Sequence, residues 1–148
     1  MDRNRAIKLI KELSEKYFPE LGNEPHRVHF VSKVDYYMAV RWKIISYHLY
    51  INNQSLKFSE PAFKGCLAHE LAHIKMDKEL SFWKRVIIRF SNNGETQMER
   101  SADNIVVEKE LGTELLQFHQ NLKKMGYKAY NSSEGLTPKE IRNRLRRD

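Results

Sequence analysis

Hydrophobic and polar residues along the chain follow two different periods, and the change between them predicts where helices give way to strands. Residues 6–17 carry apolar side chains three and four positions apart, with Lys and Glu between them, which predicts an amphipathic helix. Pro19, Gly22 and Pro25 then interrupt this pattern. Residues 28–51 are rich in Val, Ile, Tyr, Phe and Trp, a composition typical of strands. We therefore expect a small, mostly antiparallel sheet whose strands lie at 27–31, 38–42 and 46–52.

The rest of the chain returns to helical spacing. Helices are predicted at about 61–77, 81–90, 95–111, 113–125 and from 137 onward. Gly112 is expected to end one of them and Thr113 to cap the next. The sequence Thr137-Pro138-Lys139-Glu140 has the form of a capping box. This order predicts an α+β fold, with residues 1–130 as a domain and residues 131–148 as a basic C-terminal helical tail.

Length and composition narrow the classes of function. A chain of 148 residues suits one compact domain. Its single cysteine, Cys66, excludes a cysteine-built zinc finger or a disulfide scaffold, so a metal site must use histidine and carboxylate ligands. No apolar run approaches the roughly 20 residues of a membrane-spanning helix, and the start of the chain lacks the apolar core of an export signal. We expect a cytoplasmic protein without a transmembrane segment.

The formal charge of +7 arises from 26 basic and 19 acidic residues and raises the question of nucleic-acid binding. The basic residues are spread along the chain, without a tight basic run that contains aromatic residues and without a nucleic-acid motif. No nucleic-acid partner is expected, and a basic nucleic-acid-binding module is kept only as the less favoured alternative.

The candidate chemistry begins on the helix predicted at 61–77. It contains His69-Glu70-Leu71-Ala72-His73, an H-E-x-x-H pattern. Two histidines four residues apart lie one turn above each other, so both rings can reach the same ion. Glu70 lies about 100° round the helix, too far to share the ion comfortably but near enough to reach a water on it. The pattern predicts two metal ligands and a general base.

A catalytic zinc ion takes three protein ligands and leaves one position for water, so a third ligand is required. The helix predicted at 95–111 supplies Glu99 and Asp103, which lie one turn apart. One of these carboxylates can bind the metal while the other holds a ligating histidine from behind. Glu95, one turn before Glu99, and Asp77, one turn after His73, are alternative ligands.

These two motifs together resemble those of gluzincin metallopeptidases. The chain is similar to the CAAX prenyl protease and HtpX-like family, and most of all to its small soluble members, the minigluzincins, over about residues 25–125. In that family H-E-x-x-H is followed by E-x-x-A-D on a glutamate helix, here Glu99 to Asp103. The resemblance implies a zincin-like fold in which an active-site helix, a glutamate helix and a sheet edge strand, here 38–42, border a cleft.

The resemblance also implies roles for individual residues. His69, His73 and Glu99 would bind Zn²⁺, Glu70 would act as general base and acid, and Asp103 would orient His69. The expected function is hydrolysis of peptide bonds, with a peptide or protein as substrate and self-association left open. A catalytically idle, metal-bound scaffold or regulator is the alternative function.

Three further expectations concern residues outside the two motifs. The larger relatives use an additional His or Arg to stabilise the oxyanion; His119 is our first candidate for this role, and Tyr127 and Tyr130 are the others. Cys66 is expected to be a small buried thiol. Residues 131–148 are either a capping helix or a segment that blocks the cleft and keeps the enzyme latent.

Overall fold

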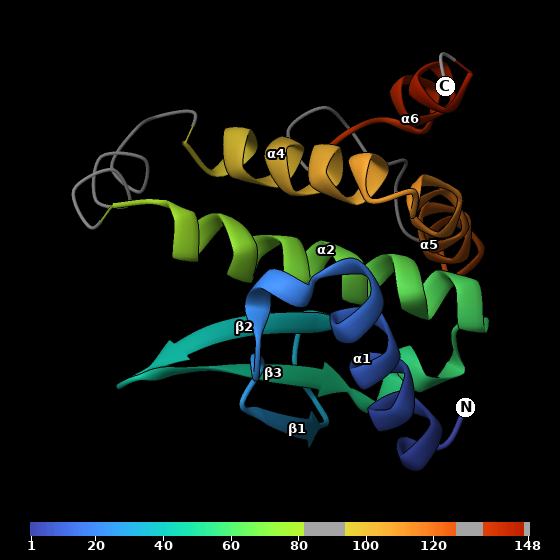
Figure 1. The fold of residues 1–148 in the computed structure, drawn as a ribbon. Helices are drawn as coiled ribbons and strands as arrows, with labels where there is room; N and C mark the ends of the chain where they lie inside the picture. The colour runs from blue at the N-terminus through green and yellow to red at the C-terminus, as the bar shows by residue number, and fades with distance from the viewer. Residues whose placement is uncertain (82–93, 127–134, 147–148) are drawn as a thin grey trace.

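In the computed structural model, residues 1–81, 94–126 and 135–146 are described. They form an α+β fold in which a long central helix separates a small sheet from the later helices (Figure 1). The predicted α+β class is confirmed. The elements in chain order are α1 (Arg3–Tyr17), η1 (Pro19–Leu21), β1 (Arg27–Val31), β2 (Met38–Lys43), β3 (Ser46–Asn52), η2 (Asn53–Lys57), α2 (Glu60–Glu79), α4 (Gly94–Glu108), α5 (Gly112–Lys124) and α6 (Pro138–Leu145).

The sheet has three strands in the order β1-β3-β2. β2 and β3 form an antiparallel hairpin, whereas β1 pairs in parallel with β3. The prediction of a mostly antiparallel sheet is therefore wrong, because one of the two pairings is parallel. The physical reason is that β1 lies beside β3 and not beside β2, its neighbour in the sequence. Within the described residues, this order leaves β2 as an edge strand, as the family resemblance implied.

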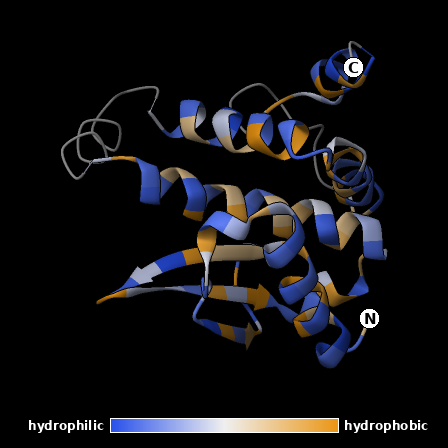
Figure 2. Cartoon of the chain, in the orientation of Figure 1, coloured by the Kyte–Doolittle hydropathy of each residue, from blue (hydrophilic) through white to orange (hydrophobic). Residues whose placement is uncertain are grey.

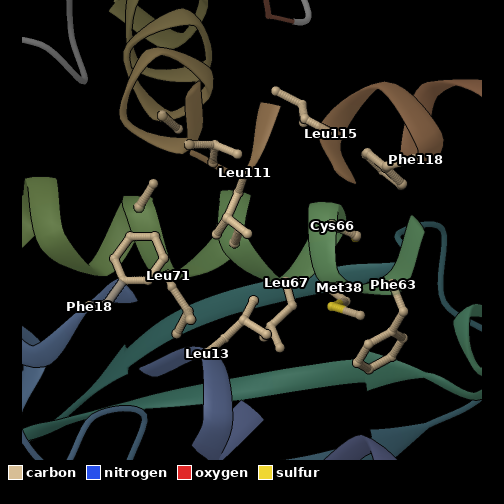
Figure 3. Packing of buried hydrophobic residues seen from close by; sticks show 14 of the residues in the cluster. Leu13, Phe18, Met38, Phe63, Cys66, Leu67, Leu71, Leu111, Leu115 and Phe118 are labelled. Carbon is tan, nitrogen blue, oxygen red and sulfur yellow. The ribbon is translucent and has the colours of Figure 1, made fainter. Parts of the chain in front are cut away.

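Helix α2 is the centre of the molecule. The sheet and α1 cover one side of it, and α4 and α5 cover the other (Figure 1). Phe63 and Leu67 project from α2 toward Met38 of the sheet, while Leu111 and Leu115 lie on the opposite side (Figure 3). All five side chains are buried. Because α2 is covered on both sides, its two metal-ligand candidates are fixed by two separate packing interfaces.

One of these interfaces depends on a glycine. A Cβ atom at Gly65 of α2 would lie 2.8 Å from the backbone nitrogen of Leu115 and closer still to the carbonyl oxygen of Glu114. Both are backbone atoms of α5, which cannot move aside as the end of a side chain can. Glycine at position 65 is what allows α5 to approach α2 so closely.

The helix boundaries correct two predictions and confirm one. The helix predicted at 95–111 ends at Glu108, because Glu110 adopts a left-handed conformation with φ of 61°. Gly112 therefore does not end that helix but begins α5, so Thr113 lies inside α5 and is not its cap. The capping box at Thr137 and Glu140 is confirmed. The helix predicted at 81–90 and the boundary predicted at 130 lie outside the described residues.

The hydropathy of the outer helices α1 and α6 agrees with their place at the surface of the fold. Both α1 and α6 carry hydrophilic as well as hydrophobic residues (Figure 2), and the buried ones include Leu9 of α1 and Ile141 of α6. None of the described helices combines the length and the apolarity that crossing a bilayer requires.

Candidate metal centre

Three predicted ligands converge between α2 and α4. His69 and His73 occupy successive turns of α2, and Glu99 lies on α4, which packs against α2. One ligand atom from each residue lies within 4.8 Å of the others. Among the described residues, this is the one group of three or more His, Cys, Asp or Glu side chains with such a geometry. The sequence motifs therefore identified side chains that the fold brings together.

The two alternative third ligands lie elsewhere. Glu95 is exposed in the first turn of α4, and the carboxylate of Asp77 accepts a hydrogen bond from the hydroxyl of Tyr47. Neither belongs to the group formed by His69, His73 and Glu99. The choice among the acidic residues, which spacing alone left open, is made by the packing of α4 on α2.

The separations of the donor atoms suit a tetrahedral zinc ion. The Nε2 atoms of His69 and His73 are 3.0 Å apart, and Glu99 Oε2 lies 2.9 Å from His69 Nε2. Glu99 Oε1 lies 3.4 Å from His73 Nε2. Ligands about 2.0–2.1 Å from a tetrahedral ion are about 3.3 Å from one another, so an ion fits among these atoms after shifts of a few tenths of an ångström. Two imidazoles and a carboxylate are also a donor set that zinc accepts.

Asp103 supports His69 from the side away from the donor group. It lies one turn after Glu99 on α4, and His69 Nδ1 donates to its Oδ1 at 2.8 Å. The side chain of Asp103 is fully buried. A carboxylate on Nδ1 fixes the orientation of the ring and leaves Nε2 for the metal. The contact implied for Asp103 by the family resemblance is therefore present.

The histidine and carboxylate groups of the site shift each other's pKa values. Burial disfavours a charge on His69, but hydrogen bonds to Asp103 and Glu99 outweigh it and raise the pKa of His69 well above its usual value. Burial tends to raise the pKa of the Glu99 carboxyl group, but the contacts with His69 and His73 outweigh burial and lower this pKa. The carboxylates thus favour a positive charge in this group, whether it is carried by a proton on His69 or by a metal cation.

Glu70 points to the edge strand of the sheet. Its Oε2 accepts a hydrogen bond from the backbone N–H of Val40 in β2 at 3.0 Å. In an antiparallel strand, the backbone N–H and C=O groups of every second residue point toward the neighbouring strand. The carbonyl of Tyr37 accepts from Asn52 N–H at the end of β3, so Tyr37 is one of the residues whose backbone groups point toward β3. The N–H of Val40 therefore points away from β3, and Glu70, whose neighbours along α2 include both histidines, binds it there.

His119, the predicted oxyanion donor, lies on α5 and is only 5% exposed. It does not belong to the donor group of three residues. Burial is the main cause that lowers the pKa of its imidazole to about 4; the charge of Asp103 raises this pKa and that of His69 lowers it. His119 is therefore neutral at pH 7, and its role as an oxyanion donor stays a prediction. Tyr127 and Tyr130 lie outside the described residues.

The low pKa of His119 makes a prediction for stability. The unfolded chain binds a proton at this residue below about pH 6.5, whereas the folded protein does so only near pH 4. The unfolding free energy should therefore fall as the pH drops from about 6.5 to 4, by up to about 3 kcal/mol from this residue alone. His119→Gln should remove that part of the slope, as measured by urea unfolding in buffers that contain a chelator. Parallel curves for the two proteins would show that the folded protein protonates His119 normally.

Two contacts of the site carried no signal in the sequence. Val40 N–H binds Glu70, and Leu136 N–H binds Asp103 Oδ2 at 2.7 Å. Both donors are backbone groups, which every residue except proline has. Cys66, one turn before His69, is buried as expected. Burial first and the charge of Glu70 second raise the pKa of its thiol, which keeps it protonated and unreactive.

Comparison of the chain with models of protein families, with curated protein sequences and with solved structures finds no match.

Proposed function

We propose that this chain is a zinc-dependent metallopeptidase with a zincin-like fold of the gluzincin type. The observation that carries the proposal is the convergence of His69, His73 and Glu99 beside Glu70. A purely structural zinc site has four protein ligands and no use for a base beside it. Here the group has three ligands, and a carboxylate from the same helix lies next to them.

The roles of the residues follow from their positions. A bound zinc ion would lower the pKa of a water to about 7 and polarise a peptide carbonyl. Glu70 accepts the proton of the attacking water and passes it to the leaving amine. Val40 N–H holds Oε2 of Glu70, which leaves Oε1 to exchange the proton. Asp103 keeps the ring of His69 in the orientation that presents Nε2.

The substrate that fits this arrangement is an extended peptide. β2 is an edge strand within the described residues, and a peptide can add to such an edge through backbone hydrogen bonds. The N–H of Val40 on that edge is already bound to Glu70, so a peptide would pair with β2 on either side of Val40 and thereby pass the general base. Affinity from backbone contacts depends little on side chains, and we expect a broad sequence preference.

Metal removal tests the proposal directly. The purified protein should hold about one zinc ion per chain. Chelation should abolish hydrolysis of unstructured casein, and zinc added afterwards should restore it. His73→Ala should lower the zinc content, because one of three ligands is lost, whereas His26→Ala, at an exposed position before β1, should leave it unchanged. Absence of bound zinc in the wild-type protein would refute the proposal, and zinc without hydrolysis would favour the idle scaffold.

A further inference from the structure

The described part of the C-terminal tail is integrated into the fold. We call residues 135–146 the C-terminal segment; it contains α6, which packs against α4 and α5. Its apolar residues Leu136 and Ile141 are fully buried. Figure 1 shows α6 on the far side of α4 and α5 from the sheet. The segment therefore lies on the side of α4 that faces away from the sheet edge at β2.

A single carboxylate connects the C-terminal segment to the metal centre. Asp103 Oδ1 accepts from His69 Nδ1 at 2.8 Å, and Asp103 Oδ2 accepts from Leu136 N–H at 2.7 Å. Both Asp103 and Leu136 are fully buried. Each oxygen thus has one identified partner, one at the metal ligand and the other in the C-terminal segment. A buried carboxylate that loses one partner becomes costly to keep in place.

Two further contacts hold the C-terminal segment at this point. The guanidinium of Arg100, one turn before Asp103 on α4, donates to the carbonyl oxygen of Gly135 at 3.0 Å and to Glu140 at 2.6 Å. Glu140 also accepts from the backbone N–H of Thr137 at 2.8 Å and completes the capping box of α6. These contacts bracket Leu136 on both sides and fix the direction of its N–H.

We propose that docking of the C-terminal segment sets the metal affinity of the site, because Leu136 N–H positions Asp103 and through it His69. The inference rests on the proposed function, since it assigns regulation to the same site. It differs from latency, one of the two alternatives that the sequence left open for residues 131–148. If the segment blocks the cleft, loosening it should raise the activity. If it positions a metal ligand, loosening it should lower the metal affinity.

The first test loosens the segment at a distance from the metal ligands. Glu140→Ala removes the contact with Arg100 and the capping box, and Arg142→Ala on the exposed side of the same helix is the matched control. Zinc affinity is measured by competition with a chromophoric chelator. Removing a group that hydrogen-bonds a metal ligand lowers metal affinity by about 10- to 100-fold. Glu140→Ala only weakens such support, so we expect zinc affinity to fall by roughly 5-fold. Arg142→Ala should match the wild-type protein.

The second test removes the N–H alone. Replacing the amide of Leu136 by an ester keeps the side chain in the core but deletes the donor to Asp103 Oδ2. The ester also weakens the Gly135 carbonyl as an acceptor for Arg100. Arg100→Gln loses this contact and the one with Glu140 but keeps the amide, so it is the comparison for that side effect. We expect a larger loss of zinc affinity in the ester protein than in Arg100→Gln. Unfolding curves establish that each variant is folded under the conditions of the titration.

The outcomes distinguish this inference from the proposed function. Unchanged zinc affinity in both the folded ester protein and Glu140→Ala would overturn the inference while leaving the proposed function intact. If the wild-type protein holds no zinc, the proposed function fails. The link from Leu136 to His69 is then tested by comparing the ring-nitrogen NMR shifts of His69 in the metal-free wild-type and ester proteins. A shift in the ester protein supports the link from Leu136 to His69, and identical spectra refute it.

Discussion

Replacing Glu70 by glutamine is expected to reduce peptide hydrolysis by about 10²- to 10⁴-fold, the range that a positioned general base contributes. The amide oxygen of glutamine can still accept the hydrogen bond from Val40 N–H, so the local geometry should be retained. Glutamine cannot take a proton from water at neutral pH, and the loss should therefore appear in kcat with little change in KM. Steady-state hydrolysis of a fluorogenic peptide measures both constants.

The control for this variant makes the same chemical change on the same helix. Glu79→Gln removes one carboxylate near the end of α2, where the side chain is exposed and pairs with Lys75. It should hydrolyse the peptide at the wild-type rate. Zinc content should be the same in all three proteins, because Glu70 lies outside the donor group. Wild-type activity in Glu70→Gln would rule out Glu70 as the base.

Gly65→Ala is expected to destabilise the fold by about 2–3 kcal/mol or more, the cost of overpacking an interior site. An alanine in place of glycine within a helix otherwise stabilises it by about 1 kcal/mol, so the sign of the effect is diagnostic. The added methyl group would overlap the backbone of α5 at Glu114 and Leu115. Separating α5 from α2 opens the core around Leu111 and Leu115, and urea unfolding measures the loss.

Gly112→Ala is the matched comparison. A Cβ atom there would lie 2.9 Å from Cδ2 of Leu145, the far end of a flexible side chain that can rotate away. We expect this variant to lose less than about 1 kcal/mol. Equal stability of Gly65→Ala and the wild-type protein would show that α2 and α5 lie farther apart than in this structure.

The parts of the fold that the sequence predicted are those encoded by local patterns. The hairpin of β2 and β3 follows from two apolar runs separated by a short turn, and the capping box at Thr137 from side chains three residues apart. The parallel pairing of β1 with β3 has no such local signature, because these two strands are separated in the sequence by β2 and its flanking loops. The left-handed residue Glu110, which ends α4, was missed because glycine is the usual signal for that conformation.

The same distinction applies to the candidate metal centre. The spacing of His69 and His73 places both on one side of a helix, whatever the fold. Glu99 could be selected only together with Asp103, as a pair one turn apart. The backbone donors of Val40 and Leu136 depend on a strand edge and a docked tail, which are properties of the tertiary structure. Side-chain chemistry was thus predictable from the sequence, and its backbone support was not.

The burial of Cys66 has a practical consequence. The chain contains one cysteine, and it is buried one turn before His69 with a protonated thiol. Thiol reagents act on the exposed thiolate, so a second cysteine placed on the surface would be modified selectively without removing the native one. Fluorophores or spin labels attached at exposed positions of α6 and β2 would then give distances across the molecule in the otherwise native protein.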